Sequence, residues 1–218
     1  MNRTVFLIDG FNLYWSAINA STDLGGQSTK WLNIHALCSS SLYAISKDAS
    51  LQGIFYFSAL AEHLEAKNPG KVQRHRDFIE CLEDTGIKKH LAKFKHKEDN
   101  QCYNCGHTWP AHEEKETDVA IAAKLLDLVV TDACDTVVLM TGDTDLAPGV
   151  RTAQKLIADK VVTEKDIRFA LPYKRHNNIL REIAPKSLRM GKERCAKYQF
   201  PDPYVLKNGR KIAKPSSW

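Results

Sequence analysis

Short apolar runs rich in β-branched and aromatic residues alternate along this chain with longer segments of helical periodicity. Five runs predict strands, at Thr4–Ile8, Leu51–Phe57, Ile87–Phe94, Thr136–Met140 and Ile167–Leu171. Six segments predict helices, at Asn12–Asn19, Trp31–Ser46, Val72–Thr85, Asp118–Val130, Ala147–Ala158 and Asn177–Ala184. Such alternation is typical of parallel sheets that are covered by helices on both faces. We therefore expect an α/β fold, a three-layer sandwich with a central, mainly parallel sheet.

Two segments depart from this alternation. Residues 97–110 contain Cys, Gly, Trp and Pro in close succession, and the periodicity fades after Pro185. We expect one domain over residues 1–184 that carries an insertion at residues 96–112. A basic C-terminal extension over residues 185–218 either wraps this domain or is mobile.

The charge of the chain is unevenly distributed. Residues 171–218 contain twelve Lys or Arg and three acidic residues, although the formal net charge of the whole chain is only +5. A basic segment on a slightly acidic body favours a polyanionic partner such as a nucleic acid, and a solvated surface is the simpler alternative. No apolar run approaches the roughly 18 residues that a membrane span needs, and no signal peptide is recognisable. We therefore expect a cytoplasmic protein with no membrane partner.

Acidic residues follow two of the predicted strands. Asp9 ends the first strand, and Asn12 comes just after it, where it either enters a site or caps the next helix. Asp143 and Asp145 follow the fourth strand, and Asp118 opens a helix. Ligands of open parallel sheets bind beyond the carboxyl ends of the strands. These four carboxylates are therefore candidates for one shared site.

Converging carboxylates repel one another unless a cation lies between them, and Mg²⁺ or Mn²⁺ is the natural occupant of a site built from oxygen ligands. Such a metal activates water for the hydrolysis of phosphodiesters. Helix capping is the simpler explanation for any single Asp, but Asp143 and Asp145 are two carboxylates where capping needs one. The first strand lacks the Gly-x-Gly-x-x-Gly of dinucleotide-binding enzymes and the Asp-x-Asp of phosphatases that form an aspartyl-phosphate.

Three motifs carry a resemblance to a known family. They are Asp9-Gly10-x-Asn12, Glu114-Lys115-x-x-Asp118 and Thr141-Gly142-Asp143-x-Asp145, in this order. With this spacing, the chain from Thr4 to about Ala184 resembles the NYN domains of the PIN-like nuclease superfamily. The resemblance implies a PIN-like Rossmannoid fold and a metal-dependent ribonuclease. It also implies roles for six residues: Asp9, Asp118, Asp143 and Asp145 as metal ligands, and Asn12 and Thr141 lining the site.

The insertion at residues 96–112 contains Cys102-x-x-Cys105 followed by Gly, which is typical of a zinc knuckle. One knuckle supplies two thiolate ligands for Zn²⁺, and we predict His96 and His112 as the other two. His107, close to Cys105, either points away or replaces one of them. A redox-active pair is the alternative, but such pairs open a helix, and Gly-His-Thr-Trp-Pro follows here. The resemblance extends to a subgroup of NYN proteins that carry a Cys-x-x-Cys insertion before the second motif.

We expect RNA as the partner, with phosphate contacts from basic residues near the carboxylates. The candidates are Arg74, Arg76, Lys174 and Arg175. The leading prediction is an endoribonuclease that cleaves single-stranded RNA with Mg²⁺ or Mn²⁺. The alternatives are a non-catalytic RNA-binding or regulatory module and, less favoured, a small-molecule enzyme that uses the same carboxylates. The sequence leaves open whether the chain forms a homodimer.

Overall fold

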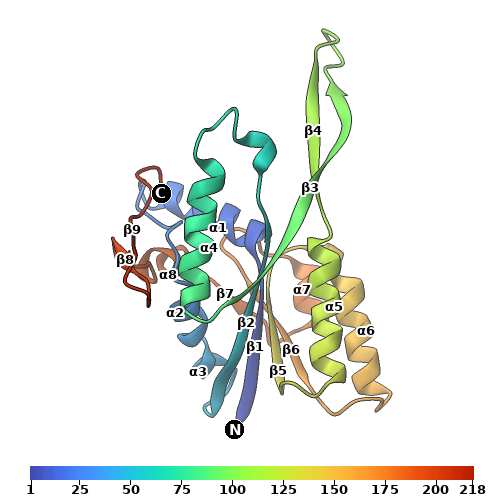
Figure 1. Cartoon of the computed structure of the whole chain (residues 1–218). Helices are drawn as coiled ribbons and strands as arrows, with labels where there is room; N and C mark the ends of the chain where they lie inside the picture. The colour runs from blue at the N-terminus through green and yellow to red at the C-terminus, as the bar shows by residue number, and fades with distance from the viewer.

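A computed structural model describes the whole chain, residues 1–218. Its centre is a seven-stranded sheet in the order β4-β3-β2-β1-β5-β6-β7 (Figure 1). The strands are β1 (Asn2–Asp9), β2 (Ala49–Ala59), β3 (Lys88–Gln101), β4 (Thr108–Lys115), β5 (Thr136–Met140), β6 (Asp166–Leu171) and β7 (Leu188–Arg189). Neighbouring strands run parallel, except that β3 and β4 are antiparallel. The predicted, mainly parallel sheet is confirmed.

Helices cover both faces of this sheet (Figure 1). One face packs against α1 (Gly10–Asp23), α2 (Ile34–Ser39), α3 (Leu42–Ile45) and α4 (Lys71–Asp84). The other face packs against α5 (Thr117–Val130), α6 (Ala147–Ala158) and α7 (Asn178–Ile183). Successive side chains of β1 alternate between the two cores, because neighbouring residues of a strand point to opposite faces. The fold is therefore the predicted three-layer α/β sandwich.

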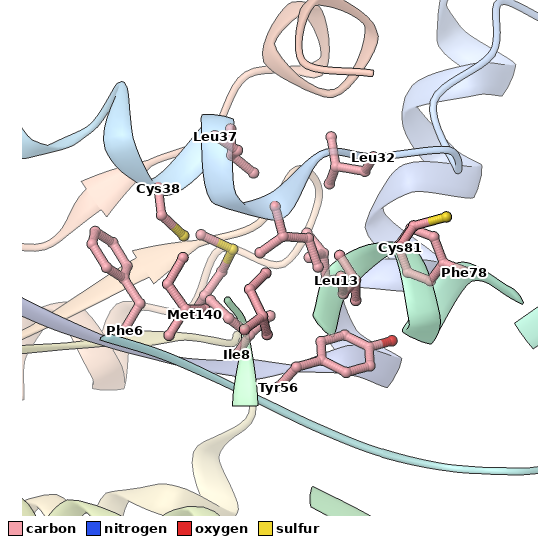
Figure 2. Close-up of a cluster of buried hydrophobic side chains, with 14 of the residues drawn as sticks. Phe6, Ile8, Leu13, Leu32, Leu37, Cys38, Tyr56, Phe78, Cys81 and Met140 are labelled. Carbon is pink, nitrogen blue, oxygen red and sulfur yellow. The ribbon is translucent and has the colours of Figure 1, made fainter. Parts of the chain in front are cut away.

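The larger core lies between the sheet and the helices α1, α2 and α4. Figure 2 shows Phe6 and Ile8 of β1 and Tyr56 of β2 near Leu37 of α2 and Phe78 of α4. These side chains are buried, so they hold the helices against the sheet through the removal of apolar surface from water. Since α1 begins directly after β1, this packing also fixes the carboxyl end of β1.

The prediction of one helix over Trp31–Ser46 is wrong, because the structure has two short helices there, α2 and α3. Asn33 caps the start of α2, where its side chain accepts a hydrogen bond from the backbone N–H of Ala36 (2.9 Å). The hydroxyls of Ser40 and Ser41 donate to the carbonyl of Leu37 at the end of α2. Serine side chains that bond to the backbone in this way compete with helix continuation.

Residues 97–110, expected as an irregular insertion, instead form most of a long hairpin. Strand β3 continues to Gln101, turns, and returns as β4, and the pair projects away from the sheet (Figure 1). Most side chains of the outer hairpin are exposed on both faces. A strand with no buried face shows no alternation of polar and apolar residues, so its sequence gives no strand pattern.

The segment after Pro185 wraps the domain. It adds β7, α8 (Lys192–Lys197) and a small hairpin of β8 (Tyr204–Val205) and β9 (Lys211–Ile212). Apolar residues from this segment are buried in the larger core: Met190, Cys195, Phe200, Leu206 and Ile212. The hydroxyl of Tyr204 also donates to the carboxylate of Asp84 on α4 (2.8 Å). None of the helices combines the length and the apolar character that a membrane-spanning segment needs.

Candidate active site

Asp9 lies where β1 ends and α1 begins, and its carboxylate is almost completely buried. Its Oδ1 accepts a hydrogen bond from the backbone N–H of Asn12 (2.9 Å) and so caps α1. Its Oδ2 accepts from Asn12 Nδ2 (2.7 Å) and from Thr141 Oγ1 (2.8 Å). Thr141 directly follows β5, the neighbour of β1, so Asp9 connects the ends of two adjacent strands.

The loop after β5 continues this network. The backbone N–H of Gly142 donates to Asn12 Oδ1 (3.2 Å), and that of Asp143 donates to Thr141 Oγ1 (3.1 Å). Asp143 Oδ1 in turn accepts from the backbone N–H of Asp145 (3.0 Å) and caps the 3₁₀ turn η2 (Thr144–Leu146). Asp143 is half-buried and Asp145 is exposed. The hydrogen bonds therefore fix Asp143 more firmly than the side chain of Asp145.

Asp118 lies in the first turn of α5 and lines the same cavity as Asp9 and Asp143. The pKa of Asp118 is raised to about 6, first by burial and then by the negative charges of four neighbours. In order of effect these are Asp9, Asp143, Glu114 and Asp145. Burial also raises the pKa of Asp9, although the hydrogen bonds from Asn12 and Thr141 oppose this effect. The carboxylates thus repel one another and disfavour the ionised form of Asp118.

Glu114 lies near the end of β4, just before α5, and the sequence predicted no role of its own for it. Its Oε1 accepts from the backbone N–H of Thr117 (3.1 Å) and from the Thr117 hydroxyl. This bond satisfies one of the free N–H groups at the start of α5. The second motif contains this residue three positions before Thr117, which is the signal that identifies it.

Both glycines of the strand-end motifs are required by close packing. A Cβ on Gly10 would lie 2.7 Å from the carbonyl oxygen of Phe57, and one on Gly142 would lie 2.3 Å from that of Arg175. Neither glycine has a positive φ. Glycine is thus needed at Gly10 because two backbones approach closely there.

Most of these carboxylates line one cavity of about 630 Å³, and neither Asp145 nor Thr141 is among its lining residues. Its acidic lining residues are Asp9, Glu114, Asp118 and Asp143, and Asn12 lies beside them. No three Asp, Glu, His or Cys side chains are close enough, as they stand, to hold one ion. The carboxylates therefore surround a common cavity rather than an ion-sized point. The donor set nevertheless fits a hard divalent cation, since all its charged members are carboxylates that repel one another.

Basic and aromatic residues line the same cavity. The basic members are Lys30, which precedes α2, and Lys71 and Arg74 of α4. Burial, together with the positive charge of Arg74, lowers the pKa of Lys30, so these two cations lie near each other. Two exposed aromatic residues of α1, Tyr14 and Trp15, also contribute to the lining. Lys30 could not be predicted as a lining residue, because a lysine in a turn-rich segment carries no signal that it will line a cavity.

Of the four predicted RNA contacts, only Arg74 lines this cavity. Its guanidinium donates to Pro69 O and to Asn68 Oδ1. Arg76 forms an ion pair with Glu62 (3.1 Å), and Lys174 forms one with Asp23 (2.6 Å). Arg175 packs against Gly142 through its Cβ and carbonyl, so it supports the loop after β5.

The structure does not bring the four predicted zinc ligands together. His96 and His112 face each other across β3 and β4, whereas Cys102 and Cys105 lie in the turn at the far end of the hairpin. About five residues of strand separate the two pairs, which is roughly 16 Å at 3.3 Å per residue. Ligand atoms of one zinc ion lie within about 4 Å of each other. These four residues therefore cannot share a single zinc ion in this arrangement.

An α/β sandwich with a mainly parallel sheet, and with carboxylates near the ends of β1 and β5, is consistent with the class of PIN-like nuclease domains. The sequence matches the NYN domain family over residues 3–163, and the chain belongs to that family. NYN domains are a PIN-like nuclease family, which supports a ribonuclease-type function in general.

The crystal structure of a protein of unknown function from Vibrio parahaemolyticus is similar to this chain. The TM-score is 0.56 at 16% sequence identity, and the match covers 87% of this chain and 93% of that one. This likeness concerns the fold alone. None of the curated proteins compared matches the chain.

Proposed function

We propose that this protein is a metal-dependent endoribonuclease that hydrolyses phosphodiester bonds of single-stranded RNA at the carboxylate site. The observation that carries this proposal is the position of Asp118, whose pKa is raised to about 6 by burial and by the charges of four other carboxylates. Three of those four line the same cavity, which leads to solvent. An uncompensated cluster of this kind is costly, so its presence at the strand ends supports a role in binding a cation.

Asp9, Asp118, Asp143 and Asp145 would hold the metal, and Mg²⁺ or Mn²⁺ suits these oxygen donors. When bound, such an ion supplies an activated water and stabilises the negative charge that develops on the phosphate. The remaining tasks fall to the chain itself. They are to hold the carboxylates in place, to orient the RNA and to keep the scissile phosphate in the cavity.

Asn12 and Thr141 act as positioning residues for Asp9. Both donate to Asp9 Oδ2, at 2.7 and 2.8 Å. These bonds set the orientation of the carboxylate and favour its ionised form despite burial. The side chain of Asn12 also accepts a hydrogen bond from the backbone N–H of Gly142, so it connects the segments that follow β1 and β5.

The basic and aromatic lining favours RNA over a small substrate. Lys30, Lys71 and Arg74 offer contacts for phosphates of the strand on either side of the scissile bond. Tyr14 and Trp15 offer exposed rings on which unpaired bases stack without a sequence requirement. A single strand presents both groups at once, whereas the bases of a duplex are already stacked.

The test is incubation of the purified chain with a fluorescent single-stranded RNA in EDTA, Mg²⁺ or Mn²⁺. Asp118→Asn is compared with Asp159→Asn, which changes a surface carboxylate that pairs with Lys155 on α6. We expect cleavage only with metal, on the order of 100-fold slower in Asp118→Asn and unchanged in Asp159→Asn. RNA that is bound yet stays intact with either metal would refute the nuclease and favour the non-catalytic RNA-binding module.

A further inference from the structure

The turn at the hairpin tip has a defined structure that the proposed nuclease does not use. The backbone N–H of Cys102 donates to His107 O (2.8 Å), and that of Gly106 donates back to Cys102 O (2.9 Å). Gly106 has a φ of 69°, which favours glycine. These bonds close the turn and bring Cys102 and Cys105 to the same end of it.

The two thiols of this turn are more accessible than those of the rest of the chain. Cys102 is half-buried and Cys105 is exposed. The other four cysteines are buried, and burial raises the pKa of Cys134 and Cys195 to about 11. Metals bind thiolates, so the tip holds the two sulfurs of this chain that are suited to a metal.

The tip nevertheless lacks the ligands for a complete site. Structural zinc sites are closed by four ligands, and no third His, Cys, Asp or Glu stands within reach of the two sulfurs. The ring of His107 is stacked on Trp109, with centroids 6.2 Å apart. His96 and His112 are also engaged elsewhere, with Asp99 and with the ring of His63 respectively.

The position of the tip shows where the missing ligands can come from. The hairpin carries it beyond the helices and the rest of the sheet (Figure 1). Cys105 is exposed, and the neighbouring Tyr103 side chain is fully exposed. A second tip can therefore approach without contact between the two domain bodies. Two identical knuckles related by a twofold axis supply four thiolates, which is a complete tetrahedral set.

We propose that Cys102 and Cys105 form half of a zinc site that is completed by the same two cysteines of a second copy of the chain. The site joins two hairpins tip to tip and binds one Zn²⁺ for two chains. It holds two copies of the chain in one assembly. The zinc site itself does not depend on the nuclease activity.

The test uses the full chain, stripped with chelator and kept in a non-chelating reductant so that no disulfide forms. Zn²⁺ or Co²⁺ is added, and the mass in solution is followed by light scattering during size-exclusion chromatography. We expect the mass to double at one metal for two chains and to return to that of the monomer with EDTA. We also expect Co²⁺ to show the visible spectrum of a tetrahedral four-thiolate site.

Two variants separate this arrangement from a site within one chain. Cys102→Ser with Cys105→Ser should abolish the thiolate spectrum and the dimer, with little change in thermal stability because the tip is exposed. The double variant His96→Asn, His112→Asn should keep both the thiolate spectrum and the dimer. One thiolate-bound metal per chain in a monomer, or loss of the metal in the histidine variant, would overturn the proposal. If the chain dimerises in chelator through another contact, the ratio of cobalt to chain and its spectrum still decide the question.

Discussion

Two polar clusters of this protein differ in what holds them in place. The carboxylates of the candidate active site follow β1, β4 and β5, so the sheet and both cores position them. The thiols of the hairpin tip depend on hydrogen bonds within the turn between Gln101 and His107. We therefore expect the geometry of the carboxylates to change when residues distant in sequence are substituted. The geometry of the thiols should change only when residues of the turn itself are substituted.

The substitution Gly142→Ala is the strongest test of whether the body of the domain positions the carboxylates. The new Cβ would lie 2.3 Å from the carbonyl oxygen of Arg175, so the loop after β5 must move and carry Thr141 and Asp143 with it. A displacement of about 1 Å at a catalytic site costs on the order of 100-fold in rate, and we expect a loss of kcat/KM of that size. RNA cleavage is the measurement, with circular dichroism to check the fold.

Gly53→Ala is the matched control, because a Cβ there meets its nearest neighbour at an ordinary 3.7 Å. We expect it to retain nearly full activity. If Gly142→Ala cleaves as fast as Gly53→Ala, the loop after β5 does not set the geometry of the reaction.

The next effect concerns the basic residues of the cavity. Lys71→Gln combined with Arg74→Gln removes two cations from the lining of the cavity. The control is Arg76→Gln on the same helix, which removes a cation that is paired with Glu62 and does not line the cavity. We expect the double variant to bind single-stranded RNA about 10-fold more weakly in EDTA. The slope of log affinity against log salt should also fall by about 0.7 for each lost phosphate contact.

Fluorescence anisotropy over a range of salt concentrations measures both quantities. Equal losses in the double variant and in Arg76→Gln would show that RNA meets the whole surface of α4. In that case the cavity would not guide the strand.

Sequence reasoning predicted the clusters unequally well, for a physical reason. The ends of β1 and β5 could be found because buried strands leave continuous apolar runs, and a parallel sheet brings their carboxyl ends to one edge. The role of Gly142 could not be found, since it depends on the packing of Arg175, 33 positions further along the chain. Lys30 reaches the cavity through a similar long-range arrangement.

The hairpin could not be predicted from the sequence, for the opposite reason. Its outer strands bury neither face, so His96 and His112 sit in a pattern that does not reveal a strand. Spacing alone suggested that they close a loop with Cys102 and Cys105. Extended strands instead separate the two pairs, which a count of intervening residues cannot show.

Asp118→Asn should stabilise the protein while it removes a proposed metal ligand. At neutral pH the charge of Asp118 is repelled by Asp9, Asp143 and Glu114, as its raised pKa indicates. Because the side chain is half exposed, solvent screens this repulsion, and we expect a gain of about 1 kcal/mol. For a domain of this size this is an increase in Tm of about 2 to 4 °C in EDTA.

Asp127→Asn is the matched control on the same helix, where it breaks an exposed pair with Lys124 (2.6 Å). Its Tm should stay the same or fall slightly. A lower Tm for Asp118→Asn would mean that the carboxylate is stabilised by the fold. The excess of negative charge at the site would then be smaller than the structure indicates.

The smallest effect is expected at the hairpin tip. Gly106 has a positive φ, so an alanine there costs about 1 kcal/mol in the turn, although a Cβ would meet only the end of the Gln101 side chain at 3.8 Å. The tip contributes nothing to either core, so this cost opens the turn locally and leaves the body folded. For Gly106→Ala we therefore expect a Tm within about 1 °C of the parent protein, unchanged cleavage of RNA and weaker binding of Co²⁺ by the thiols. A fall in Tm or in cleavage as large as that of Gly142→Ala would show that the turn is coupled to the body of the domain, and the distinction between the two clusters would fail.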